Sequence, residues 1–253
     1  MFLINFKLII FIFLLFPFVA NSNQKSDLNK SEKFNLKIVR EFEKIKKEGN
    51  PVISDEWMVV TANIQASEVA AKILKNGGTA TDAMISAQLV LGLVEPESSG
   101  LGGGAFLVYF DNETKEVTTL DGRETAPLLV KENTFQDIDG NPLKFFDAVV
   151  GGKSVGTPGT PALLEEAYKR WGKIEWSLLF KDAINLSNNG FVISKKLSSS
   201  IERSKSSFNN FVNTKSYFLP NDIPLKSGNI HYNKQYAETL KTFAKDGSKV
   251  FYQ

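Results

Sequence analysis

The sequence contains no cysteine among its 253 residues and only one histidine. The missing cysteine excludes disulfide bonds, thiolate metal sites, cysteine nucleophiles and a lipid-modified cysteine after an export signal. A Ser-His-Asp triad or a multi-histidine metal site would have to use His231. That residue lies in the polar stretch GNIHYNK without an adjacent nucleophile, so we expect an exposed loop histidine.

The sequence also lacks a large excess of basic over acidic residues, or the reverse. Thirty basic and 28 acidic residues give a net charge of +2, and no block of like charge stands out. A nucleic-acid surface needs a basic patch, so no nucleic acid is expected as a partner. With 42% hydrophobic and 23% charged residues, the composition is that of a globular protein of one large domain or two small ones.

The N-terminus has the pattern of an export signal. Lys7 precedes an apolar run over residues 8–19, and Ala20, Asn21 and Ser22 offer small residues for cleavage. The run is short for a membrane span, although an uncleaved anchor is the alternative. We predict a signal peptide over residues 1–22 and a periplasmic or secreted protein.

Residues 23–50 form a polar, lysine-rich leader with helical spacing of its few apolar residues, ended by Gly49. The main domain is predicted over residues 51–253. It opens with residues 58–62 (MVVTA), a run typical of a buried strand. Ser67 is placed to cap a helix over residues 68–75.

A second helix is predicted over residues 82–94, begun by Thr79 or Thr81, with Asp82 in its first turn. The helix is apolar nearly all round, so it should be buried between layers. Residues 105–110 and 116–120 indicate an antiparallel hairpin. Further helices are predicted over residues 162–171, 176–189, 194–201 and 232–245. Strands beside helices indicate an α/β fold class with mixed α+β layers.

Glycine gathers at residues 100–104 (GLGGG), which invites comparison with a nucleotide-binding loop. Such a loop follows a strand and opens a helix. Here a predicted helix precedes the glycines and a strand follows. We therefore interpret them as a tight helix-to-strand turn with close backbone packing. A calcium loop over residues 137–148 is disfavoured because Ala148 stands where a glutamate is required.

Arg123 stands between Asp121 and Glu124, just past a predicted strand end. A guanidinium there suits two-pronged binding of a substrate carboxylate. Composition alone favours the simpler interpretation, a structural ion pair with one of its acidic neighbours.

Four motifs carry a resemblance to a known family: residues 76–83 (NGGTATDA), 96–104 (PESSGLGGG), 120–127 (LDGRETAP) and 154–159 (SVGTPG). In this order they resemble the motifs of γ-glutamyltranspeptidases. The resemblance extends from about residue 58 to the C-terminus. It implies an N-terminal-nucleophile hydrolase with an αββα sandwich, incomplete in this chain.

The resemblance also implies a reaction and its partners. The precursor cuts itself into a large and a small subunit, and the new N-terminal threonine attacks glutathione or another γ-glutamyl donor. The acyl group passes to water or to an amino-acid or peptide acceptor, without cofactor or metal. A free α-amine can act as base for its own hydroxyl, so no histidine is needed. Arg123 matches the family arginine that binds the donor α-carboxylate, with Asp121 and Glu124 positioning it.

The sequence departs from the pattern of the family in one large respect. The nucleophile of the family lies in a Thr-Thr-His motif, which this sequence lacks; Thr118 and Thr119 are followed by Leu120 within a predicted strand. The expectation is therefore a fragment, the N-terminal part of the large subunit, without a catalytic residue of its own. Two alternatives are an exported amide acylase of the same fold and a non-catalytic binding protein built on a truncated scaffold.

Overall fold

The computed structural model describes residues 41, 44, 45 and 47–253, and the chain divides into two compact units, Met1–Glu56 and Trp57–Gln253. In the first unit the described residues up to 47 are helical, and a turn with Gly49 at φ 73° ends the helix as predicted. The predicted signal peptide and the leader up to residue 40 lie outside the described residues.

The predicted first strand, residues 58–62, is not a strand. Its side chains do alternate: Met58 and Val60 are exposed while Val59 packs against the core. Within the part of the chain that the structure describes, however, this segment belongs to neither sheet. The apolar pattern suits a strand, but a strand also needs a neighbouring backbone to pair with.

Helix α2 (Ile64–Lys75) begins four residues before its predicted start at residue 68. Asn63, not Ser67, is its N-cap, and the Asn63 side chain accepts the Gln65 N–H at 3.1 Å. Ser67 lies inside the helix, where its hydroxyl is 2.8 Å from that of Thr61. The prediction of a Ser67 cap is therefore wrong, because a better-placed Asn precedes it.

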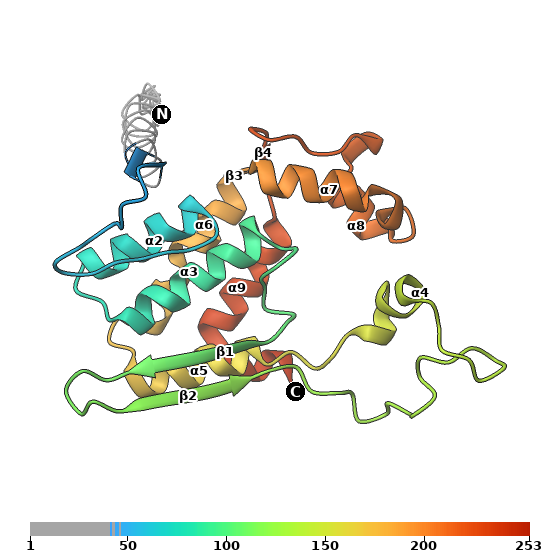
Figure 1. Cartoon of the computed structure of the whole chain (residues 1–253), viewed down its shortest axis with the longest axis horizontal. Helices are drawn as coiled ribbons and strands as arrows, with labels where there is room; N and C mark the ends of the chain where they lie inside the picture. The colour runs from blue at the N-terminus through green and yellow to red at the C-terminus, as the bar shows by residue number, and fades with distance from the viewer. Residues whose placement is uncertain (1–40, 42–43, 46) are drawn as a thin grey trace, which may run out of the picture. The chain divides into compact units, whose positions relative to one another are not determined.

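Helix α3 (Ala80–Val94) is the buried helix that the sequence predicts. Thr79 is its N-cap, and a capping box joins Thr79 and Asp82. Residues on every side of the helix are buried, and α2, α5 (Thr160–Trp171) and α6 (Lys181–Asn189) pack around it (Figure 1). The helix is apolar on nearly all sides and is buried between layers, as predicted.

Asp82 has a second role, as a buried acceptor. It is fully buried, and its carboxylate accepts the Thr79 N–H at 2.9 Å. It also accepts the backbone N–H groups of Lys173 and Ile174 at 3.1–3.2 Å. One side chain therefore joins the start of α3 to the turn that follows α5.

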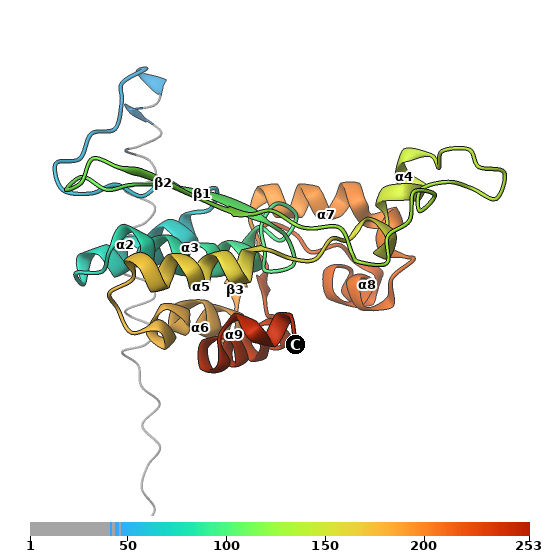
Figure 2. The same ribbon diagram turned by 90° about the horizontal axis from the view of Figure 1, so that it is seen from below.

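Strands β1 (Ala105–Phe110) and β2 (Val117–Gly122) form the predicted antiparallel hairpin. One face turns inward to α5, where Tyr109 stacks on Trp171 with ring centroids 4.1 Å apart. The opposite face is exposed and carries Phe106, Val108, Phe110 and Val117. The hairpin lies on one side of α2, α3 and α5, and α6 and α9 (Lys234–Asp246) lie on the other (Figure 2).

The C-terminal helices differ from prediction in extent. Predicted residues 176–189 divide into η2 (Trp176–Phe180) and α6, and Gly190 ends α6 as expected. Ser194 caps α7 (Lys195–Phe208), which runs beyond the predicted end at residue 201. Helix α8 (Val212–Phe218) was not predicted. The remaining elements are α4 (Phe145–Val149), η1 (Gly152–Ser154), β3 (Phe191–Val192), η3 (Pro220–Asp222), β4 (Ile230–His231) and η4 (Ser248–Phe251).

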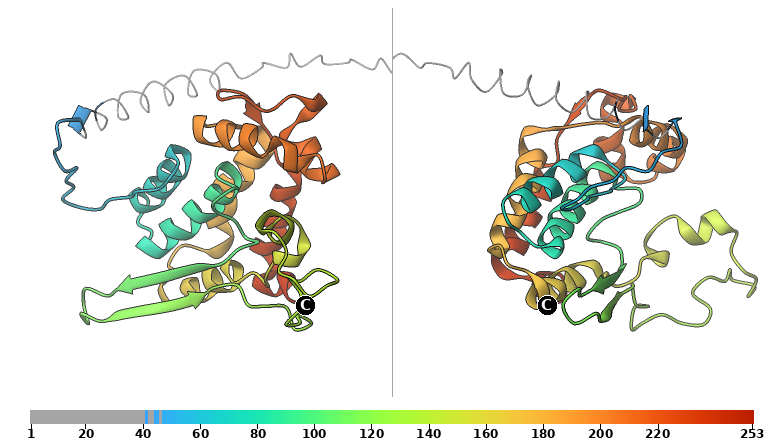
Figure 3. Two further views of the ribbon diagram at one scale, coloured as in Figure 1. Left: turned by 45° about the vertical axis from the view of Figure 1, so that its right-hand side comes forward. Right: turned by 60° about the vertical axis from the view of Figure 1, so that its left-hand side comes forward.

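Between β2 and α5 the chain makes a long excursion that carries only α4 and η1. In Figure 1 and in the right view of Figure 3 it projects away from the helices. The excursion begins and ends beside the same point, the end of β2, which is where Arg123 lies. No helix among the described residues is long and apolar enough to cross a membrane.

Candidate functional site

Arg123 follows directly on the last residue of β2 and is held by both acidic neighbours in different ways. The Asp121 carboxylate accepts the backbone N–H of Arg123 at 2.9 Å. The Glu124 carboxylate lies 3.2 Å from Nε of the guanidinium. Asp121 therefore sets the backbone of the turn, whereas Glu124 orients the side chain.

The guanidinium remains accessible in this arrangement. The Arg123 side chain is 70% exposed, and its ion pair engages Nε, the nitrogen nearest the stem. The terminal nitrogens can still form the two parallel hydrogen bonds that bind a carboxylate. The ion pair and the ligand-binding interpretation, which the sequence left as alternatives, are compatible in the structure.

Two glycine-containing segments bracket the Arg123 turn. The Gly103 carbonyl accepts the N–H groups of both Gly159 and Thr160 at 3.1 Å. Thr125 and Thr157 exchange backbone hydrogen bonds of 2.8 and 3.3 Å. The motifs at residues 96–104 and 154–159 therefore meet each other and the Arg123 turn, although 50 residues of sequence separate them.

Close backbone approach explains the glycines at this junction. A Cβ atom at Gly159 would lie 2.1 Å from the Gly122 carbonyl oxygen, and one at Gly104 would lie 2.8 Å from the Glu124 nitrogen. Such contacts are too close for any other residue. The interpretation of residues 100–104 as a turn with close packing is confirmed: α3 precedes the glycines and β1 follows. Their contact with the Arg123 turn was not predicted.

Substitution of Gly159 by alanine is expected to destabilise the protein by about 1–3 kcal/mol, because the new methyl group must displace the Gly122 peptide. Gly152→Ala is the matched control, since a Cβ there meets nothing within 4 Å. Thermal unfolding of the two variants measures the difference. Equal melting temperatures would show that the junction can relax without cost.

An ion pair between a buried glutamate and a half-exposed lysine holds the start of the glycine segment. Glu95 is buried at the end of α3; one carboxylate oxygen accepts the Asn63 amide at 3.0 Å and the other lies 2.7 Å from Lys196 Nζ. The pair joins α3 to the start of α2 and to α7. Sequence reasoning missed it, and its one local signal was a carboxylate at the end of an otherwise apolar helix.

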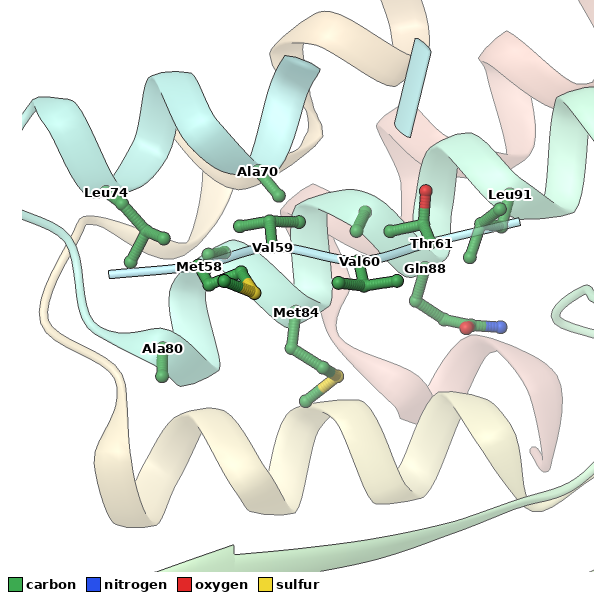
Figure 4. A pocket seen from close by; sticks show the side chains of 12 residues that line it. Met58, Val59, Val60, Thr61, Ala70, Leu74, Ala80, Met84, Gln88 and Leu91 are labelled. Carbon is green, nitrogen blue, oxygen red and sulfur yellow. The ribbon is translucent and has the colours of Figure 1, made fainter. Parts of the chain in front are cut away.

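A cleft of about 320 Å³ lies beside α3, with the extended segment 58–61 running along it (Figure 4). Its walls are mainly apolar and come from that segment and from α2 and α3. The lining residues are Met58, Val59, Val60, Thr61, Ala70, Leu74, Ala80, Ala83, Met84, Ala87, Gln88 and Leu91. Without a charged side chain, such a cleft suits an apolar polypeptide segment better than a polar substrate.

His231 does not lie in an exposed loop. It is half-buried in β4, pairs with Phe191 of β3, and its ring lies 4.4 Å from that of Tyr217. Its Nε2 is buried without a hydrogen-bond partner among the described residues. Burial lowers the pKa of His231. The flanking polar residues suggested a loop, whereas pairing with a distant strand decides its burial.

Acid is expected to destabilise the protein partly through His231. Because its pKa is lowered in the folded state, the unfolded chain binds more protons once the pH falls below about 6.5. Folding stability then falls as the pH is lowered further. His231→Phe should lose less stability than the wild type between about pH 7.5 and 5.5. Parallel urea titrations at both pH values check this; identical losses would contradict it.

Other candidates from the sequence do not join the Arg123 turn. Thr118 and Thr119 lie within β2 as predicted, paired with Tyr109 and Val108. Asp137 Oδ1 accepts the N–H groups of Asp139 and Asn141, so this carboxylate organises its own turn. Arg123 is therefore the candidate on which the site depends.

The chain that carries this site is similar to known proteins over most of its length. The profile of the gamma-glutamyltranspeptidase family matches residues 66–253. The chain belongs to the γ-glutamyltranspeptidase family. The glutathione hydrolase proenzyme of Bacillus subtilis subsp. natto is 38% identical over 201 residues, which cover 79% of this chain and 34% of that protein.

Solved γ-glutamyltranspeptidases share the fold. The enzyme from Helicobacter pylori superposes with a TM-score of 0.76 at 31% identity, over 80% of this chain and 58% of that one. The enzyme from Pseudomonas nitroreducens gives a TM-score of 0.72 at 30% identity, over 79% and 58%. The expected N-terminal-nucleophile hydrolase fold is thus confirmed. The chain spans about a third of the length of the curated relatives it matches.

Proposed function

We propose that this chain is the donor-binding part of an exported enzyme that transfers γ-glutamyl groups from glutathione or other γ-glutamyl amides to water or to amino acids and peptides. The observation that carries the proposal is the Arg123 turn. It presents an accessible guanidinium, oriented by Glu124, on a backbone held by Asp121 and the two glycine-containing segments. Membership of the γ-glutamyltranspeptidase family supports it.

The α-carboxylate of the donor is the group that Arg123 would bind. A carboxylate on the terminal nitrogens gains two charge-assisted hydrogen bonds without displacing Glu124 from Nε. Because hydrogen bonds already hold the turn in place, little conformational entropy of the turn is lost when the donor binds. The γ-carbonyl would then lie a fixed distance away from Arg123, ready for attack.

The nucleophile of the proposed reaction is a threonine supplied by the remainder of the family polypeptide. It would become N-terminal by self-cleavage, and its α-amine would take the proton of its hydroxyl. The hydroxyl oxygen attacks the γ-carbonyl carbon, the amine product leaves with a proton, and an acyl-threonine remains. Water or an acceptor amine then releases the glutamyl group. Several curated relatives, the Bacillus subtilis proteins among them, are named proenzymes, which agrees with processing.

The partner that completes the site would be the small subunit of the same enzyme. The hairpin exposes Phe106 and Val108 on its outer face, and residues 58–61 offer an extended backbone that lies beside an apolar cleft and pairs with no described strand. An αββα sandwich covers such a face with a second sheet. Additional strands would pair with the extended backbone of residues 58–61, and the second sheet would cover the exposed face of the hairpin.

Export is part of the proposal and rests on the sequence alone. The apolar run over residues 8–19 after Lys7 is the supporting feature. N-terminal sequencing of the mature protein tests it: cleavage near residue 22 supports a periplasmic or secreted enzyme, whereas an intact Met1 contradicts the cleaved signal.

Expression of the complete reading frame tests the function. We expect a precursor that divides into two polypeptides and releases p-nitroaniline from γ-glutamyl-p-nitroanilide, faster when glycylglycine is added as acceptor. Residues 23–253 alone should release none, because the nucleophile is absent. Activity of those residues alone, or no activity of the processed protein, would contradict the proposal.

A donor analogue separates the proposal from the amide-acylase alternative. The 4-aminobutyryl-p-nitroanilide keeps the amide and the amine but lacks the α-carboxylate that Arg123 would bind. A γ-glutamyl-specific enzyme should prefer the complete donor by about ten-fold or more in kcat/KM. Equal rates on both compounds would favour an acylase, and a processed protein that binds the donor without turnover would favour a binding protein.

A further inference from the structure

Tyr252 reaches the Arg123 region from the far end of the chain. It follows η4, and its hydroxyl donates to the Pro158 carbonyl at 2.8 Å and accepts the Ala162 N–H at 3.3 Å. These partners lie 94 and 90 residues away in sequence. The hydroxyl therefore joins the last residue before Gly159 to the first turn of α5.

Pro158 and Gly159 form one wall of the Arg123 turn. The closest approach is between Gly159 and the Gly122 peptide, where a Cβ would lie 2.1 Å from the carbonyl oxygen. A Cβ at Gly159 would also lie 2.9 Å from the Arg123 carbonyl oxygen. The Pro158–Gly159 segment therefore packs directly against the backbone on both sides of the Gly122–Arg123 peptide bond.

A second attachment fixes Tyr252 relative to α5. The Glu165 carboxylate of α5 accepts the Ser248 N–H at 2.6 Å, at the start of η4. Phe251 packs edge-on against Phe243 of α9, with ring centroids 5.2 Å apart. With η4 held at its start and near its end, the Tyr252 hydroxyl has a defined position and can act as a brace.

We propose that Tyr252 is a positioning residue for Arg123: its hydroxyl holds the segment 158–159 against the Gly122 peptide and so fixes the direction of the guanidinium. The inference rests on the proposed function for its effect on catalysis, while its effect on the turn depends on the structure alone. An experiment can therefore contradict the proposed function without contradicting the effect of Tyr252 on the turn, and the reverse.

Tyr236 provides a matched control for Tyr252. Its hydroxyl also donates to a backbone carbonyl, that of Leu89, at 2.9 Å. The bond lies within the helical layers and involves neither the Arg123 turn nor the segment 158–159. Tyr236→Phe and Tyr252→Phe thus each remove a hydroxyl that donates to a backbone carbonyl, and Tyr252→Phe also removes the acceptor of the Ala162 N–H. Only Tyr252→Phe should affect the site.

Hydrogen exchange in the complete enzyme tests the structural part. In Tyr252→Phe, the amides of Thr125, Thr157, Gly159 and Thr160, which bond across the junction, should exchange at least about three-fold faster. In Tyr236→Phe they should exchange at the wild-type rate. Unchanged exchange in Tyr252→Phe, or equal acceleration in both variants, would overturn the inference.

Kinetics test the consequence for the donor. Tyr252→Phe should raise KM for γ-glutamyl-p-nitroanilide about three-fold with kcat nearly unchanged, and should add no further increase when Arg123 is already alanine. An additive effect in the double variant, or an unchanged KM in the single one, would overturn the positioning role. An unchanged KM in Arg123→Ala would instead overturn the proposed function, and hydrogen exchange would still decide whether Tyr252 holds the turn.

Discussion

Replacement of Arg123 by alanine in the complete enzyme is expected to raise KM for glutathione at least about ten-fold, which corresponds to about 1.4 kcal/mol of binding energy. The guanidinium is 70% exposed, so in the proposed complex its loss removes a charged partner for the donor carboxylate. The value of kcat should change less than KM, because the proposal has Arg123 hold a part of the donor that does not react. Steady-state kinetics over a range of glutathione concentrations measure both constants.

Arg170→Ala is the control for the loss of a surface arginine. Arg170 pairs with Glu166 one turn away on α5 and lies on the helix surface. Such a pair contributes about 0–1 kcal/mol to stability and touches no part of the proposed site. Its removal should leave KM unchanged. If Arg123→Ala also leaves KM unchanged, the guanidinium has no place in donor binding.

Asp82→Ala should cause the largest loss of stability among single side-chain changes considered for this protein, about 3 kcal/mol. The carboxylate is fully buried and accepts backbone N–H groups of Thr79, Lys173 and Ile174. Alanine leaves these donors without their acceptor in the interior. We expect the melting temperature to fall by about 5 °C or more and the yield of folded protein to fall with it.

Asp182→Ala is the comparison that separates a buried acceptor from a surface ion pair. Asp182 bonds Lys72 at 2.7 Å between α6 and α2, with the lysine more than half exposed. A pair in that setting is worth about 1 kcal/mol or less. Thermal unfolding of both variants under the same conditions should show the larger shift for Asp82→Ala. Similar shifts would mean that the three N–H groups find other acceptors.

Elements with strong local signals were predictable from sequence. Helix α3 has a capping box at Thr79 and Asp82 and an apolar surface on all sides, and both signals lie within the helix itself. The hairpin of β1 and β2 follows from two short strand-like runs joined by a turn. Helix α5 ends at Trp171, the predicted last residue, and Gly172 follows it in an extended conformation.

Features that depend on distant partners were not predictable. Residues 58–62 have the composition of a strand, but strand formation requires a paired backbone, which the described chain does not provide. His231 was placed in a loop because its neighbours are polar, whereas pairing with Phe191, 40 residues earlier, buries it. In neither case does the local sequence indicate whether a distant strand is present to pair with the segment.

The candidate site also combines local features, which the sequence predicts, with contacts between distant segments, which it does not predict. Arg123 could be selected through its motif, and the acidic neighbours through adjacency. The contacts that brace it, from Gly103 to Gly159 and from Tyr252 to Pro158, join segments about 56 and 94 residues apart. Composition suggested a choice between an ion pair and a binding residue, and only the geometry shows that Glu124 on Nε leaves the other nitrogens accessible.

A crystal structure of the complete enzyme with L-glutamate bound is the most direct test of the proposal that Arg123 binds the donor. We expect both terminal nitrogens of Arg123 to lie about 2.8 Å from the α-carboxylate oxygens, with Glu124 still on Nε. The Gly122 and Gly159 peptides should keep their contact. Glutamate bound with its α-carboxylate on other residues, and Arg123 still exposed to solvent, would contradict the account.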